Sequence, residues 1–155
     1  MQIFTSLTKE AFPVLRYRSG DLAAIDRTQC GCGRTTARMT RVKGRTDDML
    51  IIRGINVFPS EIEAALLTQP DIAPHYQIVV YRVRNLDVLE VRAELTAEFV
   101  HRHRVDSEVS RVLAAKVAEA IRGEIGLSVE VQLLAPQCVP RSEGKAVRVQ
   151  DLRKA

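Results

Sequence analysis

The stretch Gly44–Glu63 reads GRTDDMLIIRGINVFPSEIE and contains, in order, a charged turn, a short apolar run, a glycine and the start of a helix. Within it, Ser60 is placed as a helix N-cap with Glu63 three residues later, which is the spacing of a capping box. The pattern predicts that this helix ends at Pro70, because proline cannot continue a helix. The residues before and after the stretch follow different patterns, so we place a structural boundary within it.

Downstream of this stretch, two helices are predicted. The inward stripe and edge of the first are formed by Ile62, Ala65, Leu66 and Gln69. The second runs from Asp106 or Ser107 to Gly126, which is placed as the glycine that stops a helix. Its apolar residues follow helical spacing; they are Val109, Val112, Leu113, Val117, Ala120, Ile121 and Ile125.

Strand patterns lie between and after the helices. Residues 76–83, YQIVVYRV, are rich in β-branched side chains. In residues 88–96, VLEVRAELT, apolar residues alternate with Glu90, Arg92 and Glu94, which predicts one buried face and one wet face. Residues 128–134, SVEVQLL, form a last strand, followed by a loop and a basic tail. From Met49 onward the order is β-α-β-β-α-β, which predicts a two-layer α+β domain with one helical layer on a sheet.

The first 46 residues show no helical period. They read as short strands separated by turns, among them a Ser-Gly-Asp turn at residues 19–21 and a Cys/Gly turn at residues 30–33. Small hairpins of this kind seldom stand alone in water. We therefore expect this β-rich segment to need another surface to cover it.

Composition narrows the class of protein. The 155 residues are 46% hydrophobic and 27% charged, which is typical of a globular chain. The net charge of +4 is spread along the chain among 19 acidic residues, which disfavours nucleic acid as a partner. The sequence shows neither a secretory signal nor a membrane span, and we expect a cytoplasmic location.

Three cysteines, an odd number, argue against a disulfide framework. Cys30 and Cys32 in CGCGRT supply only two sulfur ligands, with Cys138 far along the chain. Because a zinc site needs four ligands, a glycine-rich hairpin turn is favoured here and no metal site is predicted. Whether this pair binds anything stays open.

Three stretches carry side chains suited to chemistry: RYRSGD at residues 16–21, the opening stretch, and PRSEGKAVR at residues 140–148. Each also has a plain structural interpretation. A Ser-Gly-Asp turn commonly bonds its own backbone, Asp47 could be solvated in a surface connector, and Glu-Gly-Lys could be a turn with an exposed lysine.

Taken in order, together with CGCGRT, these stretches resemble the C-terminal end of adenylate-forming enzymes. Within that superfamily the chain is most similar to the phenylacetate-CoA ligase family, and the resemblance covers essentially the whole chain. Such enzymes use ATP, with Mg²⁺, to activate a carboxylate as an acyl-adenylate and then transfer the acyl group to coenzyme A. The resemblance therefore implies an aryl acid, ATP and coenzyme A as ligands.

The resemblance also implies roles for five residues. Asp21 matches the aspartate that holds the ribose hydroxyls, and Arg45 a contact to the ribose region. Lys145 matches the catalytic lysine that bridges the substrate carboxylate and the α-phosphate. Asp47 matches the hinge on which the small domain swings between two orientations. Gly54 matches a glycine beside the pantetheine tunnel.

By the same resemblance, residues 1–46 are a β-rich remnant of the N-terminal adenylate-binding domain, and residues 47–155 are the C-terminal lid domain. The phosphate loop and the acyl pocket belong to the missing N-terminal domain, so we expect the chain alone to be inactive. The acid that is activated, the origin of the short chain and a homodimer stay open. The alternative is a stand-alone small-ligand-binding or interaction module with a split βαβ fold.

Overall fold

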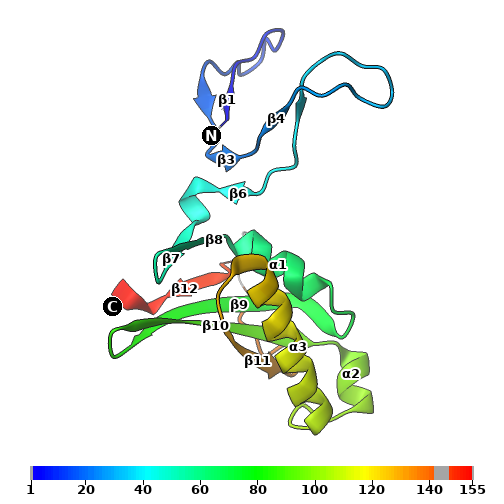
Figure 1. Cartoon of the computed structure of the whole chain (residues 1–155), viewed down its shortest axis with the longest axis vertical. Coiled ribbons are helices and arrows are strands. Elements are labelled where there is room, and N and C mark those ends of the chain that lie inside the picture. Colours follow the sequence, from blue (N-terminus) through cyan, green and yellow to red (C-terminus); the bar gives the residue numbers. More distant parts are fainter. Residues whose placement is uncertain (1, 142–146, 155) are drawn as a thin grey trace. The chain divides into compact units, whose positions relative to one another are not determined.

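The computed structural model describes residues 2–141 and 147–154, and the chain divides into two compact units between Met49 and Leu50 (Figure 1). This division lies inside the stretch where the sequence pattern changes. Each unit is described by itself below.

The first unit consists of three short antiparallel strand pairs followed by one turn of 3-10 helix, η1 (Thr46–Asp48). The pairs are β1 (Ile3–Phe4) with β2 (Tyr17–Arg18), β3 (Asp21–Leu22) with β6 (Gly44–Arg45), and β4 (Ile25–Asp26) with β5 (Arg38–Met39). Short strands joined by turns are what the sequence predicted for this region.

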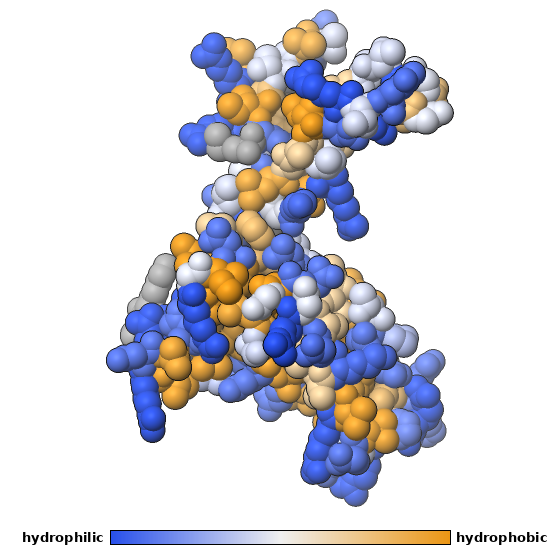
Figure 2. Space-filling view, in the orientation of Figure 1, coloured by the Kyte–Doolittle hydropathy of each residue, from blue (hydrophilic) through white to orange (hydrophobic). Residues whose placement is uncertain are grey.

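The first unit has no buried core among residues 2–49. Leu7, Phe12 and Leu15 are 93%, 85% and 80% exposed, and hydrophobic side chains lie on the surface of this unit in Figure 2. Backbone pairing and side-chain bonds in the turns hold the unit, because little apolar area is removed from water.

The second unit begins with a hairpin and continues through a helix–strand alternation. Its elements are β7 (Leu50–Ile52), β8 (Ile55–Val57), α1 (Pro59–Leu67), β9 (Ile72–Val83), β10 (Leu86–Leu95), α2 (Ala97–Arg102), α3 (Glu108–Ile125), β11 (Glu130–Leu134), β12 (Val149–Asp151) and η2 (Leu152–Lys154). The expected α+β class is confirmed by this mixture of helices with a mixed sheet.

One sheet of four strands, in the order β11-β10-β9-β12, forms the centre of this unit. β9 and β10 are antiparallel, with Val91 opposite Ile78, while β11 and β12 run parallel to their neighbours. The predicted first strand does not join this sheet, because β7 and β8 pair only with each other. The edge position beside β9 is taken instead by β12, from the segment that the sequence pattern assigned to a loop and tail.

The start of α1 differs from the predicted capping box. Phe58 is the N-cap and Pro59 the first helical residue, and Glu61 accepts a hydrogen bond from the Phe58 N–H at 3.2 Å. Ser60 is thus inside the helix, because proline is well tolerated at the first helical position, where its missing N–H is not needed. The predicted ends of α3 are confirmed: Ser107 caps its first turn, and Gly126 ends it at φ 71°.

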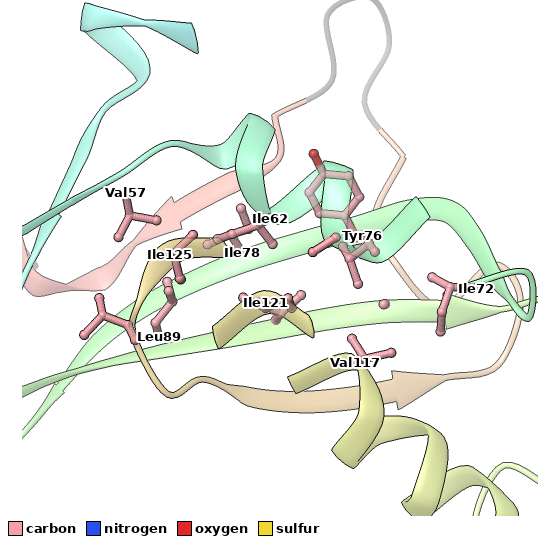
Figure 3. Packing of buried hydrophobic residues seen from close by; sticks show 14 of the residues in the cluster. Val57, Ile62, Ile72, Tyr76, Ile78, Leu89, Val117, Ile121 and Ile125 are labelled. Carbon is pink, nitrogen blue, oxygen red and sulfur yellow. The ribbon is translucent and has the colours of Figure 1, made fainter. Parts of the chain in front are cut away.

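The core lies between the sheet and the helices α1 and α3 (Figure 3). Its side chains include Val57, Ile62, Ile72, Tyr76, Ile78, Leu89, Val117, Ile121 and Ile125. Burial of each large aliphatic side chain contributes about 1.5–3 kcal/mol. The prediction that Val109 and Val112 of α3 face the core is wrong. They are 46% and 62% exposed, because they lie to the side of the helix face that packs on the sheet.

Candidate functional site

Asp21 and Arg45 lie directly opposite each other on strands β3 and β6. The Arg45 Nε atom is 3.8 Å from Asp21 Oδ1, and Arg45 Nη2 donates to the Ser19 carbonyl oxygen at 3.2 Å. Ser19 Oγ accepts a hydrogen bond from the Asp21 N–H at 3.3 Å. Although the two residues are far apart in sequence, antiparallel pairing places a carboxylate and a guanidinium side by side at the surface of the first unit.

Asp47 lies in η1 and joins the same group. Its Oδ2 atom is 3.5 Å from Arg45 Nη2, and its side chain is 73% exposed. Gly20 adopts φ +77°, and a β-carbon there would lie 3.3 Å from Asp47 Oδ2. Thr46 donates both its N–H and its hydroxyl to the Gly20 carbonyl oxygen, at 2.9 and 3.1 Å. The structure therefore brings together three of the five predicted site residues, Asp21, Arg45 and Asp47.

Gly54 lies in the second unit, at the tip of the β7–β8 hairpin. Arg53 and Gly54 form its two-residue turn, with φ 50° and 80°. A turn with two positive φ values matches the twist of a hairpin, and glycine adopts such values without strain. Apart from its two chain neighbours, no atom of the described residues lies within 4 Å of the position of a β-carbon on Gly54. Among these residues, the backbone conformation rather than a close neighbour is thus what requires glycine here.

The β7–β8 hairpin is tied to the sheet through Asp87. Arg53 Nε donates to the Asp87 carbonyl oxygen at 2.7 Å. Arg153 donates to Asp87 Oδ2 at 2.8 Å and to the Ile51 carbonyl oxygen at 2.7 Å. Hydrogen bonds from Arg153, and then from Arg82, lower the pKa of Asp87. The hairpin is consequently held through strand β7 and through the Arg53 side chain, while Gly54 is left exposed.

We expect Gly54→Ala to reduce the free energy of unfolding by about 1 kcal/mol, because the left-handed conformation is unfavourable for alanine, while no described neighbour obstructs its methyl group. Urea denaturation of the chain measures this change. Gly123→Ala is the matched control: Gly123 also has nothing within 4 Å, but it lies inside α3, where alanine should stabilise by about 0.5–1 kcal/mol. Equal effects at both positions would contradict the conformational explanation.

Glu94 is the one charged residue that the structure buries completely among the described residues, with 1% of its surface exposed. Its carboxylate accepts hydrogen bonds from the Val139 N–H at 2.7 Å and from Arg141 Nη2 at 2.8 Å. The predicted wet position of Glu94 is wrong, because the chain returns over this end of β10 and covers it. The carboxylate thereby anchors residues 139–141 to the sheet.

Arg148, which follows residues 142–146 in the sequence, is held by contacts of its own. It forms an ion pair with Glu63 of α1 and donates to the Tyr76 hydroxyl at 2.9 Å. Its guanidinium carbon also lies 4.7 Å from the centroid of the Tyr76 ring. Burial, reinforced by the Glu63 carboxylate and opposed by Arg148, raises the pKa of Tyr76 to about 12. Helix α1, strand β9 and the residue that precedes β12 are linked through these three side chains.

Lys145, the predicted catalytic residue, lies outside the described residues. What the structure adds is the anchoring of Arg141 by Glu94 and of Arg148 by Glu63. Sequence reasoning missed both anchors. The only signal for them was the presence of two arginines in PRSEGKAVR, since nothing in the sequence identifies partners that are 47 and 85 residues away.

We expect Glu94→Gln to reduce the free energy of unfolding by about 2 kcal/mol at pH 7, because it replaces charge-assisted hydrogen bonds with neutral ones. Burial acts to raise the pKa of Glu94, but the Val139 N–H, Arg141 and the Gln137 N–H together lower it. A lowered pKa means that this contribution is present above the unfolded value of about 4.3 and is lost as the pH falls through the folded value.

The difference between the parent chain and Glu94→Gln in urea denaturation should therefore shrink as the pH falls from 6 to 3. Glu124→Ala, at an exposed position of α3, serves as a control and should change stability by less than about 0.5 kcal/mol at either pH. A difference that is independent of pH would show that the carboxylate charge at Glu94 contributes nothing.

A groove of about 650 Å³ lies beside these anchors, lined in part by Gln77, Arg92, Gln132, Arg141 and Gln150. Arg92 is opposite both Gln77 and Gln132 in the sheet, and strand alternation directs these side chains away from the face that buries Val91 and Ile78. The groove lies on the sheet face that α1 and α3 do not cover, and its lining is mixed, because Leu134, Val139, Pro140, Val147 and Val149 also contribute to it.

Within residues 2–141 and 147–154, no three His, Cys, Asp or Glu side chains gather as a metal site would require. No helix in the described part of the chain has the length and apolar composition needed to cross a membrane.

Residues 54–153 match the family model described as the AMP-binding enzyme C-terminal domain. The chain belongs to this family. The phenylacetate-coenzyme A ligase of Thermus thermophilus is 46% identical over 98% of this chain, which corresponds to 36% of that protein. The predicted resemblance to the C-terminal portion of such ligases is confirmed, and the chain spans about a third of the length of the relatives it matches.

Solved structures agree with this membership. A 2-hydroxyisobutyryl-CoA ligase in a postadenylation state, bound to R3-HIB-AMP, matches 98% of this chain and 32% of its own, with a TM-score of 0.80 and 33% identity. The same ligase bound to 2-HIB-AMP and CoA in the thioesterification state matches with a TM-score of 0.63. This ligase is thus seen with AMP adducts and with CoA, which supports the use of ATP and CoA in the family.

Proposed function

We propose that this chain is the C-terminal part of an ATP-dependent aryl-CoA ligase that forms phenylacetyl-CoA. In the first step a phenylacetate oxygen attacks the α-phosphate of ATP, so that the acyl-adenylate forms and pyrophosphate leaves. In the second step the thiolate of CoA attacks the acyl carbon and AMP leaves. The identity of the acid rests on the names of the relatives. By the resemblance, the acyl pocket belongs to the N-terminal domain, and this chain spans only 36% of the Thermus thermophilus ligase.

The group formed by Asp21 and Arg45 is the observation that carries this proposal. A carboxylate can accept hydrogen bonds from both hydroxyls of a ribose, and the guanidinium beside it can donate to the nucleotide while it holds the Asp21 side chain in place. Their cross-strand positions present both groups from one short strand pair. The Ser19 contacts to both residues fix the turn that precedes Asp21.

Asp47, Lys145 and Gly54 complete the proposed machinery. Asp47 is the hinge on which the lid domain reorients between the two steps. Lys145 supplies positive charge to the substrate carboxylate and α-phosphate in the first step. Gly54, at the exposed tip of its hairpin, is proposed to allow close approach of the pantetheine chain in the second. Mg²⁺ is proposed to arrive with the nucleotide. ATP and CoA as co-substrates fit the expected cytoplasmic location.

A chimeric ligase tests this function. In it, residues 1–155 replace the matching part of the Thermus thermophilus relative. We expect the chimera to form phenylacetyl-CoA from phenylacetate, ATP and CoA, whereas the 155-residue chain alone should show only background exchange of pyrophosphate into ATP. Thioester formation, measured by the loss of free CoA thiol, reports the complete reaction.

Asp21→Asn in the chimera should mainly raise the KM for ATP, because the amide retains one acceptor and loses the charge. The control variant Glu124→Ala, on an exposed face of α3, should leave that KM unchanged. A well-folded but inactive chimera would argue against the ligase and in favour of the stand-alone binding module, and turnover by the chain alone would refute the assignment of activity to the longer protein.

A further inference from the structure

Cys30 and Cys32 place two thiols in contact at the turn between β4 and β5. The Cys32 thiol donates to the Cys30 sulfur, with 3.1 Å between the two Sγ atoms. Cys32 is exposed and Cys30 is half-buried. Two sulfurs this close, at least one of them open to solvent, form a geometry that can react as a pair.

The turn itself does not need the thiols. Gly33 adopts φ +83°, and its N–H donates to the Cys30 carbonyl oxygen at 2.9 Å. Two contacts to the Asp26 carboxylate hold the base of this turn. Arg38 pairs with it at 2.8 Å, and the Thr28 N–H donates to it at 2.8 Å. Backbone bonds and this charged network would close the turn with other small side chains in place of the cysteines.

The surroundings favour a thiolate at Cys30. The Cys32 N–H, then the Cys32 thiol and in smaller part Arg38 lower the pKa of Cys30, while burial opposes them. Arg38 Nε is buried and has no hydrogen-bond partner within the described residues, so a negative charge on the nearby sulfur would be stabilised there. Because the thiolate is the nucleophile in thiol–disulfide exchange, Cys30 is the residue set to attack first.

We propose that Cys30 and Cys32 form a redox-active dithiol, which a small-molecule disulfide oxidises to an intrachain Cys30–Cys32 disulfide. The Cys30 thiolate attacks one sulfur of the oxidant and releases the other half as a thiolate. Cys32 then loses its proton and attacks the Cys30 sulfur, which releases the second half. In sum, two protein thiols lose two electrons and two protons, and the oxidant becomes two thiols. This inference does not depend on the ligase activity.

Oxidised glutathione is a suitable probe, and Cys138→Ser is the parent for the test because Cys138 lies in the other unit. We expect this parent to lose both titratable thiols, to stay monomeric on a non-reducing gel, and to yield a peptide in which Cys30 and Cys32 are linked. Dithiothreitol should restore both thiols. Retention of both thiols, or dimers linked between chains, would overturn the proposal.

Removing the second thiol separates a reactive pair from one reactive cysteine. With Cys32→Ser added to Cys138→Ser, the glutathione adduct on Cys30 should accumulate at least about tenfold more than in the parent, because the neighbouring thiol, present at millimolar effective concentration or more, no longer displaces it. Equal accumulation in both proteins would refute the paired mechanism. Peptide mapping of the parent decides the question even if the double variant does not fold.

Discussion

Lys145→Ala in the chimeric ligase is expected to slow acyl-adenylate formation by about 100- to 1,000-fold. This range is what removal of one preorganised donor to a developing charge costs in other active sites. The physical reason is that two negatively charged groups, the substrate carboxylate and the α-phosphate, must approach each other in the first step, and a cation between them offsets their repulsion. A lysine ammonium, a compact charge on a flexible stem, can neutralise it and then withdraw.

The second step should largely survive this change, because Lys145 is proposed to reach the α-phosphate only in the orientation of the lid that serves the first step. Thioester formation from supplied phenylacetyl-adenylate should remain within about threefold of the parent, against the 100-fold loss expected in the first step. Lys116→Ala, at an exposed position of α3, is the matched control for loss of a lysine charge. If both half-reactions fall equally with folding intact, Lys145 does not have the role proposed for it.

Asp47→Pro is expected to separate the two half-reactions, slowing one by about 100-fold, the order of loss that misplaced reacting groups cause, and sparing the other. Proline fixes φ near −65°, which falls in the range of the 3-10 turn that Asp47 occupies. The orientation of the lid that shares this φ should therefore remain accessible, while the other is lost because the torsion can no longer change.

Asp47→Ala removes the carboxylate charge but leaves the backbone torsions at this position free to change. The Asp47 carboxylate contacts Arg45 and Thr46 only at 3.5 Å and is mostly exposed, so its loss should cost less than about 1 kcal/mol and retain most activity. Single-turnover assays of adenylate and thioester formation distinguish the two variants. If Asp47→Pro slows neither step, this segment is only a connector between the two units and not a hinge.

The candidate site was predictable to the extent that each residue lies in a recognisable local pattern. Asp21 and Arg45 were identified from separate motifs, and only the antiparallel pairing of β3 with β6 shows that they are neighbours. The anchoring of Arg141 by Glu94 was not predictable. An acidic residue in an alternating strand pattern normally faces water, and no local signal announces that a distant segment will cover it.

The sequence by itself determined the elements whose causes are local: the α+β class, the extent of α3 between its cap at Ser107 and its stop at Gly126, and the alternation along β10. Short-range hydrogen bonds and periodic apolar residues act within a few positions, so they can be read directly. Only the tertiary structure decided that β12 completes the sheet and that Glu94 is buried. The reason is that both depend on contacts between distant segments, whose free energy comes from the partner that each segment meets after the chain has folded.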